Sequence, residues 1–207
     1  NDVTITAIGT ITDGNGTNNN ISAATTTLLG TAIGTSSDAI ETTVTTLNAT
    51  STNGVFITES GDLALGTISA ATDVVITASS AITDANAGLN NITANTLTLS
   101  ATAIGTSADA IETSVATLNA TSTSSVFITE SDGLALGTIT ASSTGDVTIT
   151  ASGAITDGNG TTTNITAGTA TLSGTAIGST TDAIETTITT LNATSTSSVF
   201  ITESDGL

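Results

Sequence analysis

The chain has 207 residues and a formal net charge of −18, because its 18 acidic residues are not balanced by any Lys, Arg or His. Cys, Met, Pro, Trp and Tyr are also missing. Mechanisms that need an imidazole, a thiolate or a Schiff base are excluded, which leaves only carboxylates and hydroxyls for chemistry. Nucleic acids and anionic lipids are excluded as partners, because no side chain can neutralise a phosphate.

The composition predicts a folded chain that is rich in strands. Hydrophobic residues make up 37% and charged residues 9% of the chain, whereas disordered segments combine low hydrophobicity with high charge. The apolar residues are mostly Ala, Ile, Leu and Val beside abundant Thr and Ser, and β-branched side chains favour strands. No apolar run approaches the roughly 20 residues that a membrane-spanning helix needs, so we expect no membrane insertion.

The predicted strands alternate apolar and hydroxyl-bearing side chains, as in 3–7 (VTITA) and 97–101 (LTLSA). This alternation places Val, Ile and Leu inward and Thr and Ser outward. Turns are predicted at 12–16 and 156–160, which both read TDGNG, because Gly and Asn tolerate left-handed backbone conformations. Residues 38–49 are ambiguous: a capping-box pattern favours a short helix, whereas the run of Thr favours a compact coil of strand.

A long repeat is the strongest signal in the sequence. Closely similar segments begin at Asp38, Asp109 and Asp182, which gives a repeat length of about 71–73 residues. Inside each long repeat, the start of an apolar alternation recurs about every 18 residues, a length that suits one turn of a β-solenoid. These starts are Val3, Ile21, Ile40, Val55, Val74, Ile92, Ile111, Val126, Val147, Ile165, Ile184 and Val199.

We therefore predict an all-β fold, a parallel β-helix or β-solenoid of about 12 coils of about 18 residues each. Residues 1–207 are expected to form one continuous segment of a longer array, with long repeats at about 1–71, 72–144 and 145–207, the last one truncated. Twelve coils stacked at about 4.8 Å give a rod of about 57 Å. Four coils per long repeat would place equivalent carboxylates about 19 Å apart along the axis, beyond the screening length of about 8 Å.

The segments DVTITASGAITDGNG (146–160) and TLSGTAIG (171–178) resemble the repeats of filamentous haemagglutinin-like adhesins, which are large bacterial surface proteins. The resemblance extends over the whole chain as repeat texture. It implies a right-handed parallel β-helix that forms the shaft of a secreted, extracellular or cell-surface rod acting in adhesion or biofilm. The chain departs from that family in having no basic residues and no recognisable binding tip.

Two turns carry a weak calcium-binding signal. Asp13 and Asn15, and equally Asp157 and Asn159, resemble fragments of turns whose closely spaced oxygen atoms bind a hard cation. The alternative is that these residues only shape the turns. Calcium is the one cofactor that the sequence suggests.

Acidic side chains also occur as close pairs, of the kind that glycoside hydrolases use. An active site is normally built once, whereas this pair occurs three times, so we expect solvated faces and no enzyme. The pairs are Glu59 with Asp62, Glu130 with Asp132, and Glu203 with Asp205.

Phe56, Phe127 and Phe200 are the only aromatic residues and occupy one slot of the repeat. Because Val55 and Ile57 are expected to point inward, alternation turns the Phe side chain outward. Either a neighbouring loop covers the ring or the ring turns into the core, or the ring is an apolar contact through which rods pack laterally or a partner is anchored.

These observations predict a structural rod rather than an enzyme. The expected partners are other copies of the chain, in filaments or bundles, or a host or neighbouring cell surface reached through parts outside this segment. The alternative is a repeated module that binds carbohydrate or calcium. Neither nucleic acid nor membrane insertion is expected.

Overall fold

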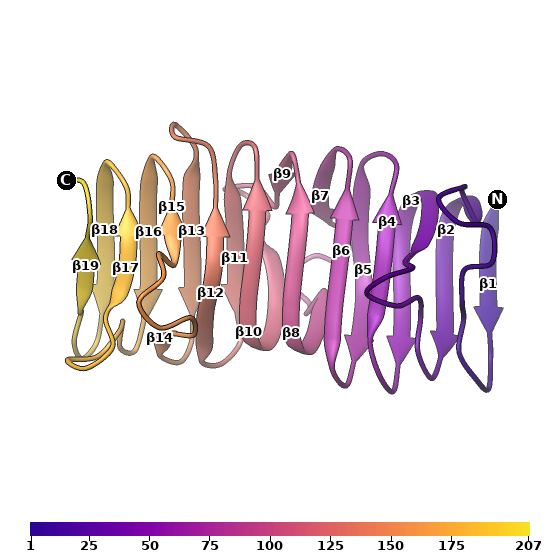
Figure 1. Ribbon diagram of the computed structural model, residues 1–207, viewed down its shortest axis with the longest axis horizontal. Coiled ribbons are helices and arrows are strands. Elements are labelled where there is room, and N and C mark those ends of the chain that lie inside the picture. Colours follow the sequence, from indigo (N-terminus) through magenta and orange to yellow (C-terminus); the bar gives the residue numbers. More distant parts are fainter.

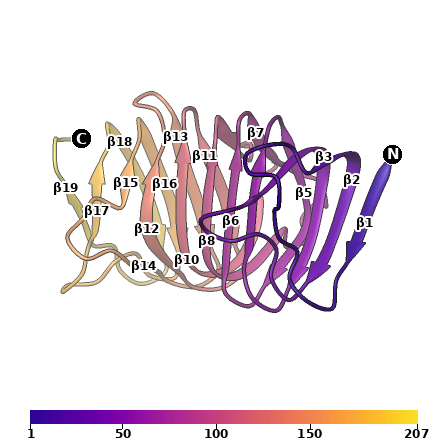
Figure 2. The same ribbon diagram turned by 45° about the vertical axis from the view of Figure 1, so that its right-hand side comes forward.

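The computed structural model describes all 207 residues, which wind into one β-solenoid (Figure 1). Its 19 strands belong to a single hydrogen-bonded sheet. All pairings between named strands are parallel. The two termini lie at opposite ends of the stack in both views (Figures 1 and 2). The predicted all-β solenoid is confirmed.

The strands are short and are separated by turns and loops, with no helix anywhere in the chain. They are β1 (Asp2–Thr6), β2 (Ile21–Gly30), β3 (Ile40–Ser51), β4 (Val55–Glu59), β5 (Leu63–Ala70), β6 (Asp73–Ala78), β7 (Ala81–Asp84), β8 (Ile92–Ala101), β9 (Ala103–Ile104), β10 (Ile111–Ser122), β11 (Val126–Glu130), β12 (Leu134–Thr140), β13 (Asp146–Ala151), β14 (Ile155–Asp157), β15 (Ile165–Thr166), β16 (Thr169–Gly174), β17 (Ile184–Thr187), β18 (Thr190–Ser195) and β19 (Ile201–Glu203).

The number of turns follows from one column of stacked residues, which we call the Glu130 column. Its members are Ile5, Leu28, Ala49, Ile68, Ile92, Thr113, Glu130 and Ala151. One residue earlier, the stacking continues from Thr150 to Ser173 and then to Thr194. The stack therefore has ten levels, and each turn of the solenoid takes about 21 residues on average.

The predicted twelve coils of about 18 residues are therefore too many and too short. The error arises because an apolar start marks the beginning of a strand, and some turns contain two starts. Val74, for example, stacks on Leu97 in the middle of β8, whereas the next start, Ile92, stacks on Ile68.

The long repeat spans about three and a half turns, which places equivalent residues on alternate sides of the solenoid. Ala49 and Ile68 are stacked neighbours in the Glu130 column, and Glu59 lies half way between them along the chain. Glu59 and its counterpart Glu130 consequently face opposite sides. The stacked pairs that start from Glu203 lead back to Ile57, two residues before Glu59. Glu203 therefore lies on the same side as Glu59. The predicted four coils per long repeat, with equivalent carboxylates about 19 Å apart along the axis, are therefore too many.

The interior is a continuous apolar column, in which 43 buried hydrophobic residues form one cluster. Within β3 burial alternates from Ile40 to Val44, slips by one residue, and resumes at Leu47. The strand bends at this slip, which explains why its inward residues show the spacing of a helix. Residues 38–49 therefore contain strand, and the short helix that the capping pattern suggested does not form.

Ten turns at about 4.8 Å give nine spacings and a length of about 43 Å, shorter than the sequence suggested. This length can be measured directly, because the chain has no cysteine. Spin labels at Thr4→Cys and Thr194→Cys, both exposed positions of one column, should give a narrow distance distribution centred at about 43 Å by double electron–electron resonance.

The control pair, Thr4→Cys with Thr150→Cys, lies two turns closer and should give about 34 Å. Equal distances for the two pairs, or a broad distribution for either, would contradict the ten-turn rod.

Candidate functional site

A buried asparagine fastens one loop of each repeat to the turns on either side of it. Asn91 is fully buried, and its Nδ2 atom donates to the carbonyl oxygen of Leu65 at 2.9 Å, to Asp84 Oδ1 at 2.5 Å and to Asn86 Oδ1 at 3.1 Å. Its Oδ1 atom accepts from the Glu112 backbone N–H at 2.9 Å. One amide thus joins three successive turns.

The third repeat builds the same arrangement around Asn164, which is also fully buried. Its Nδ2 atom donates to Leu136 O at 2.9 Å, to Asp157 Oδ1 at 2.6 Å and to Asn159 Oδ1 at 3.0 Å. Its Oδ1 atom accepts from the Glu185 N–H at 2.9 Å. The oxygen atoms that the sequence suggested as calcium ligands at Asp157 and Asn159 already surround an amide nitrogen.

In the first repeat Asn20 has the same role, but it is exposed. Its Nδ2 atom donates to Asp13 Oδ1 at 2.6 Å, and its Oδ1 atom accepts from the Glu41 N–H at 2.7 Å. The Asn15 N–H also donates to Asp13 Oδ1, at 2.9 Å. These two donors hold the pKa of Asp13 below its ordinary value.

Asparagines 20, 91 and 164 were missed by sequence reasoning, although a signal exists. Each follows the turn aspartate by seven residues in all three repeats, at Asp13, Asp84 and Asp157. The Asn amide can donate from its nitrogen to an aspartate of the turn and accept at its oxygen from a backbone N–H of a strand. In a chain without cations, such an amide can hold an acidic turn against a strand.

Five buried carboxylate oxygens lack a hydrogen-bond donor, and all belong to this same part of the repeat. They are Asp13 Oδ2, Glu41 Oε2, Glu112 Oε2, Asp157 Oδ2 and Glu185 Oε2. Burial and the nearby charge of Asp84 raise the pKa of Glu112. No group of three or more acidic side chains gathers here or elsewhere in the chain, so each cluster offers two carboxylates.

We predict that Asn91→Ala lowers the free energy of unfolding by about 2–4 kcal/mol, because several buried partners lose their hydrogen bonds together. Chemical denaturation monitored by circular dichroism measures the change. The control is Asn90→Ala at the exposed neighbouring position, which should be nearly neutral. Similar losses in the two variants would contradict the fastening role of Asn91.

A second repeated contact involves the glutamates of the acidic pairs. Glu59 and Glu130 are each only 1% exposed, so the expectation of solvated faces is wrong for them. Glu130 Oε2 accepts from the Thr113 hydroxyl at 2.7 Å and from the Val115 N–H at 3.1 Å, and Oε1 accepts from the Asp132 N–H at 3.2 Å. The carboxylate provides the acceptor for Val115 where β11 ends.

The same contact produces opposite pKa shifts at two places along the rod. Burial, together with the side chain of Asp132, raises the pKa of Glu130, and the hydrogen bonds from Thr113 and Val115 oppose this effect only in part. For Glu203, in the last turn, burial acts in the same direction, but hydrogen bonds from Thr186 and Asp205 outweigh it and lower the pKa to about 2. Glu130 is 1% exposed, whereas Glu203 is only partly buried, so the charged form of Glu130 loses more solvation.

The raised pKa of Glu130 predicts a pH dependence of stability. The folded state binds a proton at Glu130 more tightly than the unfolded chain does. The contribution of Glu130 to the free energy of unfolding is therefore fully present below the ordinary glutamate pKa of about 4.3. It is lost as the pH rises through the raised pKa of the folded state. Glu130→Gln should remove this loss, which the melting temperature as a function of pH will show.

The control for this measurement is Asp73→Asn, which makes the same charge change at an exposed position. Its melting temperature should follow that of the unmodified chain across the same pH range. The interpretation fails if both variants change the pH dependence equally.

The three phenylalanines are half-buried and lie in the predicted outward positions. Phe56 is flanked by the buried Val55 and Ile57, and its ring covers Gly54, where an added Cβ would lie 2.7 Å from the ring. Phe127 occupies the equivalent place in β11, and Phe200 is also half-buried. Because of the half-turn offset, Phe56 and Phe127 face opposite sides. Lateral packing through these rings stays a prediction.

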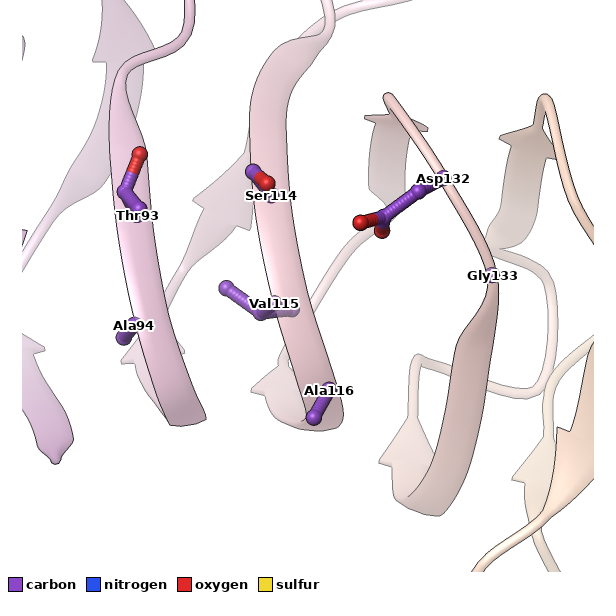
Figure 3. A pocket seen from close by; sticks show the side chains of 7 residues that line it. All are labelled: Thr93, Ala94, Ser114, Val115, Ala116, Asp132 and Gly133. Carbon is purple, nitrogen blue, oxygen red and sulfur yellow. The ribbon is translucent and has the colours of Figure 1, made fainter. Parts of the chain in front are cut away.

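The molecule has one cavity, of about 410 Å³, which opens at the surface over three successive turns. Thr93 from β8 and Ser114, Val115 and Ala116 from β10 line it, together with Asp132 from the loop after β11 (Figure 3). Among the residues of the acidic pairs, only Asp132 lines this cavity.

Comparisons with protein-family models, with curated proteins and with solved structures gave no match. No helix of the chain is long and apolar enough to cross a membrane.

Proposed function

We propose that this chain is a structural rod, part of the shaft of a secreted bacterial surface adhesin or of an extracellular matrix filament. The observation that supports this proposal is the unbroken parallel ladder through all 19 strands around one apolar column. Each turn of such a solenoid contacts only its neighbours, so length and stability increase with every added turn. The resemblance to filamentous haemagglutinin-like adhesins points to the same role.

The chemistry of the surface suits a location outside the cell. A chain without Lys and Arg offers no site to trypsin-like proteases. Equivalent carboxylates on alternate sides are about 17 Å apart along the axis, beyond the screening length of about 8 Å in physiological salt. The net charge of −18 is thus compatible with a long stack.

Self-association into layers or bundles is part of this proposal. Because Phe56 and Phe127 are half-buried on opposite sides, each rod offers an apolar contact to a neighbour on either side. Contacts on two sides build extended layers, whereas contacts on one side would build only pairs. Adhesion to a host or neighbouring cell would use other parts of the protein.

To test this proposal, arrays with one, two or three long repeats are anchored by one end to a bacterial surface, and an epitope tag is placed at the other end. We expect antibody access to the tag to increase with repeat number, by about 17 Å of reach for each repeat. Arrays that lose attachment to a surface when shortened, with unchanged tag access, would instead identify a binding module.

A second candidate function is repeated calcium binding. It is favoured by the five buried carboxylate oxygens without donors, which recur at one place in the repeat, because a buried anionic oxygen needs a hydrogen-bond donor or a cation. The display assay separates the two candidates when it is repeated with calcium and with a chelator. A passive rod should give the same tag access in both, whereas a calcium-binding module should collapse or soften on chelation.

A further inference from the structure

The one cavity coincides with departures of the second repeat from the other two. Ser114 and Ala116 line it, whereas the first repeat has Thr43 and Thr45 at these positions, and the third repeat also has Thr at both. Relative to Thr, Ser114 lacks the methyl group and Ala116 lacks both the methyl group and the hydroxyl, which creates space. The loop differs from that of the first repeat only, since Asp132 precedes its glycine, as Asp205 does in the third repeat, whereas Asp62 follows it.

The same departures leave polar groups without partners. In the first repeat the Thr43 hydroxyl bonds to Ser60 at 2.7 Å, and Asp62 Oδ1 accepts from the Ala81 N–H at 3.0 Å. In the second repeat neither the Ser114 hydroxyl nor the Asp132 carboxylate bonds to another group of the opposite turn. Figure 3 shows the Asp132 side chain extending from its loop toward β10, which carries Ser114.

The walls of the cavity combine one charge, two hydroxyls and an apolar floor. The Asp132 carboxylate and the hydroxyls of Thr93 and Ser114 provide acceptors, while Val115 and Ala116 provide apolar contact. The cavity is open to solvent and has a volume of about 410 Å³, so it can admit a side chain from a second protein.

Charge decides which ligand suits this cavity. The chain has no Lys, Arg or His, and the buried Glu130 lies directly behind the loop that carries Asp132. An anion would therefore meet only repulsion. An ammonium group can donate to the carboxylate and to both hydroxyls at once, and an aliphatic stem can lie over the apolar floor.

We propose that this cavity binds a lysine side chain of a partner protein. The inference goes beyond the rod function and does not depend on it. It would make the second repeat the place where the otherwise uniform shaft engages a basic partner, and the exposed carboxylate of Asp132 would be the group that recognises the ammonium.

The test is an NMR titration of the intact 207-residue chain with Nα-acetyl-lysine methylamide as the probe. We expect saturable shifts of the backbone amides at Thr93, Ser114 and Gly133, which weaken when the ionic strength is raised. Asp132→Asn should reduce the affinity about fivefold, the factor expected for one exposed ion pair. Ala116→Thr, which restores the side chain of the other repeats, should abolish the shifts by filling the cavity.

The matched control is Asp62→Asn, which makes the same charge change in the first repeat and should leave binding unchanged. Circular dichroism confirms that each variant folds. The proposal is overturned if Asp62→Asn weakens binding as much as Asp132→Asn, if the Nε-acetylated probe binds equally well, or if 1,5-diaminopentane or a methyl glucoside binds where the blocked lysine does not.

Discussion

The parallel backbone ladder is the interaction on which everything else in this molecule depends. The chain forms 130 backbone hydrogen bonds, 81 of them within strands, and it has no side-chain cation from which an ion pair could be made. Each inner strand must bond to a turn on both sides, and the absence of Pro keeps every backbone N–H available for this purpose. Turns can therefore be added without changing the design of their neighbours.

Where a strand ends, side chains provide the hydrogen-bond partners that the backbone of the next turn no longer provides. Glu59 accepts from the Val44 N–H at 3.0 Å where β4 ends, and Glu130 does the same for Val115. At the loops Asn91 and Asn164 act as donors instead, since each donates to a carboxylate oxygen, of Asp84 and Asp157 respectively. In most proteins a buried carboxylate is paired with Arg or Lys. Here hydroxyls and backbone N–H groups are the hydrogen-bond donors to the buried carboxylates.

The fold class could be predicted from the sequence, because alternation, turn residues and repetition all indicate a solenoid. The number of turns could not. An apolar start such as Ile92 marks a strand rather than a turn, and the bend of β3 between Val44 and Leu47 imitates the spacing of a helix. Local pattern does not reveal where the chain comes back to stack on itself.

The candidate sites show the same limit. The acidic turns at Asp13 and Asp157 were found, but their partners Asn20 and Asn164 lie outside the local motif. Glu130 looked like a surface residue because glutamates usually are, and its burial depends on the turn stacked beside it. The cavity at Asp132 needed the register of three turns, since its residues are spread from Thr93 to Gly133.

The half-turn offset of the long repeat has a consequence for evolution by duplication. Each repeat gained or lost rotates everything beyond it by half a revolution about the axis, as the exchange of sides between Glu59 and Glu130 shows. A domain attached at the far end would therefore change the direction in which it faces with every such event. Whether the copy number is odd or even thus determines orientation, and the number itself determines reach.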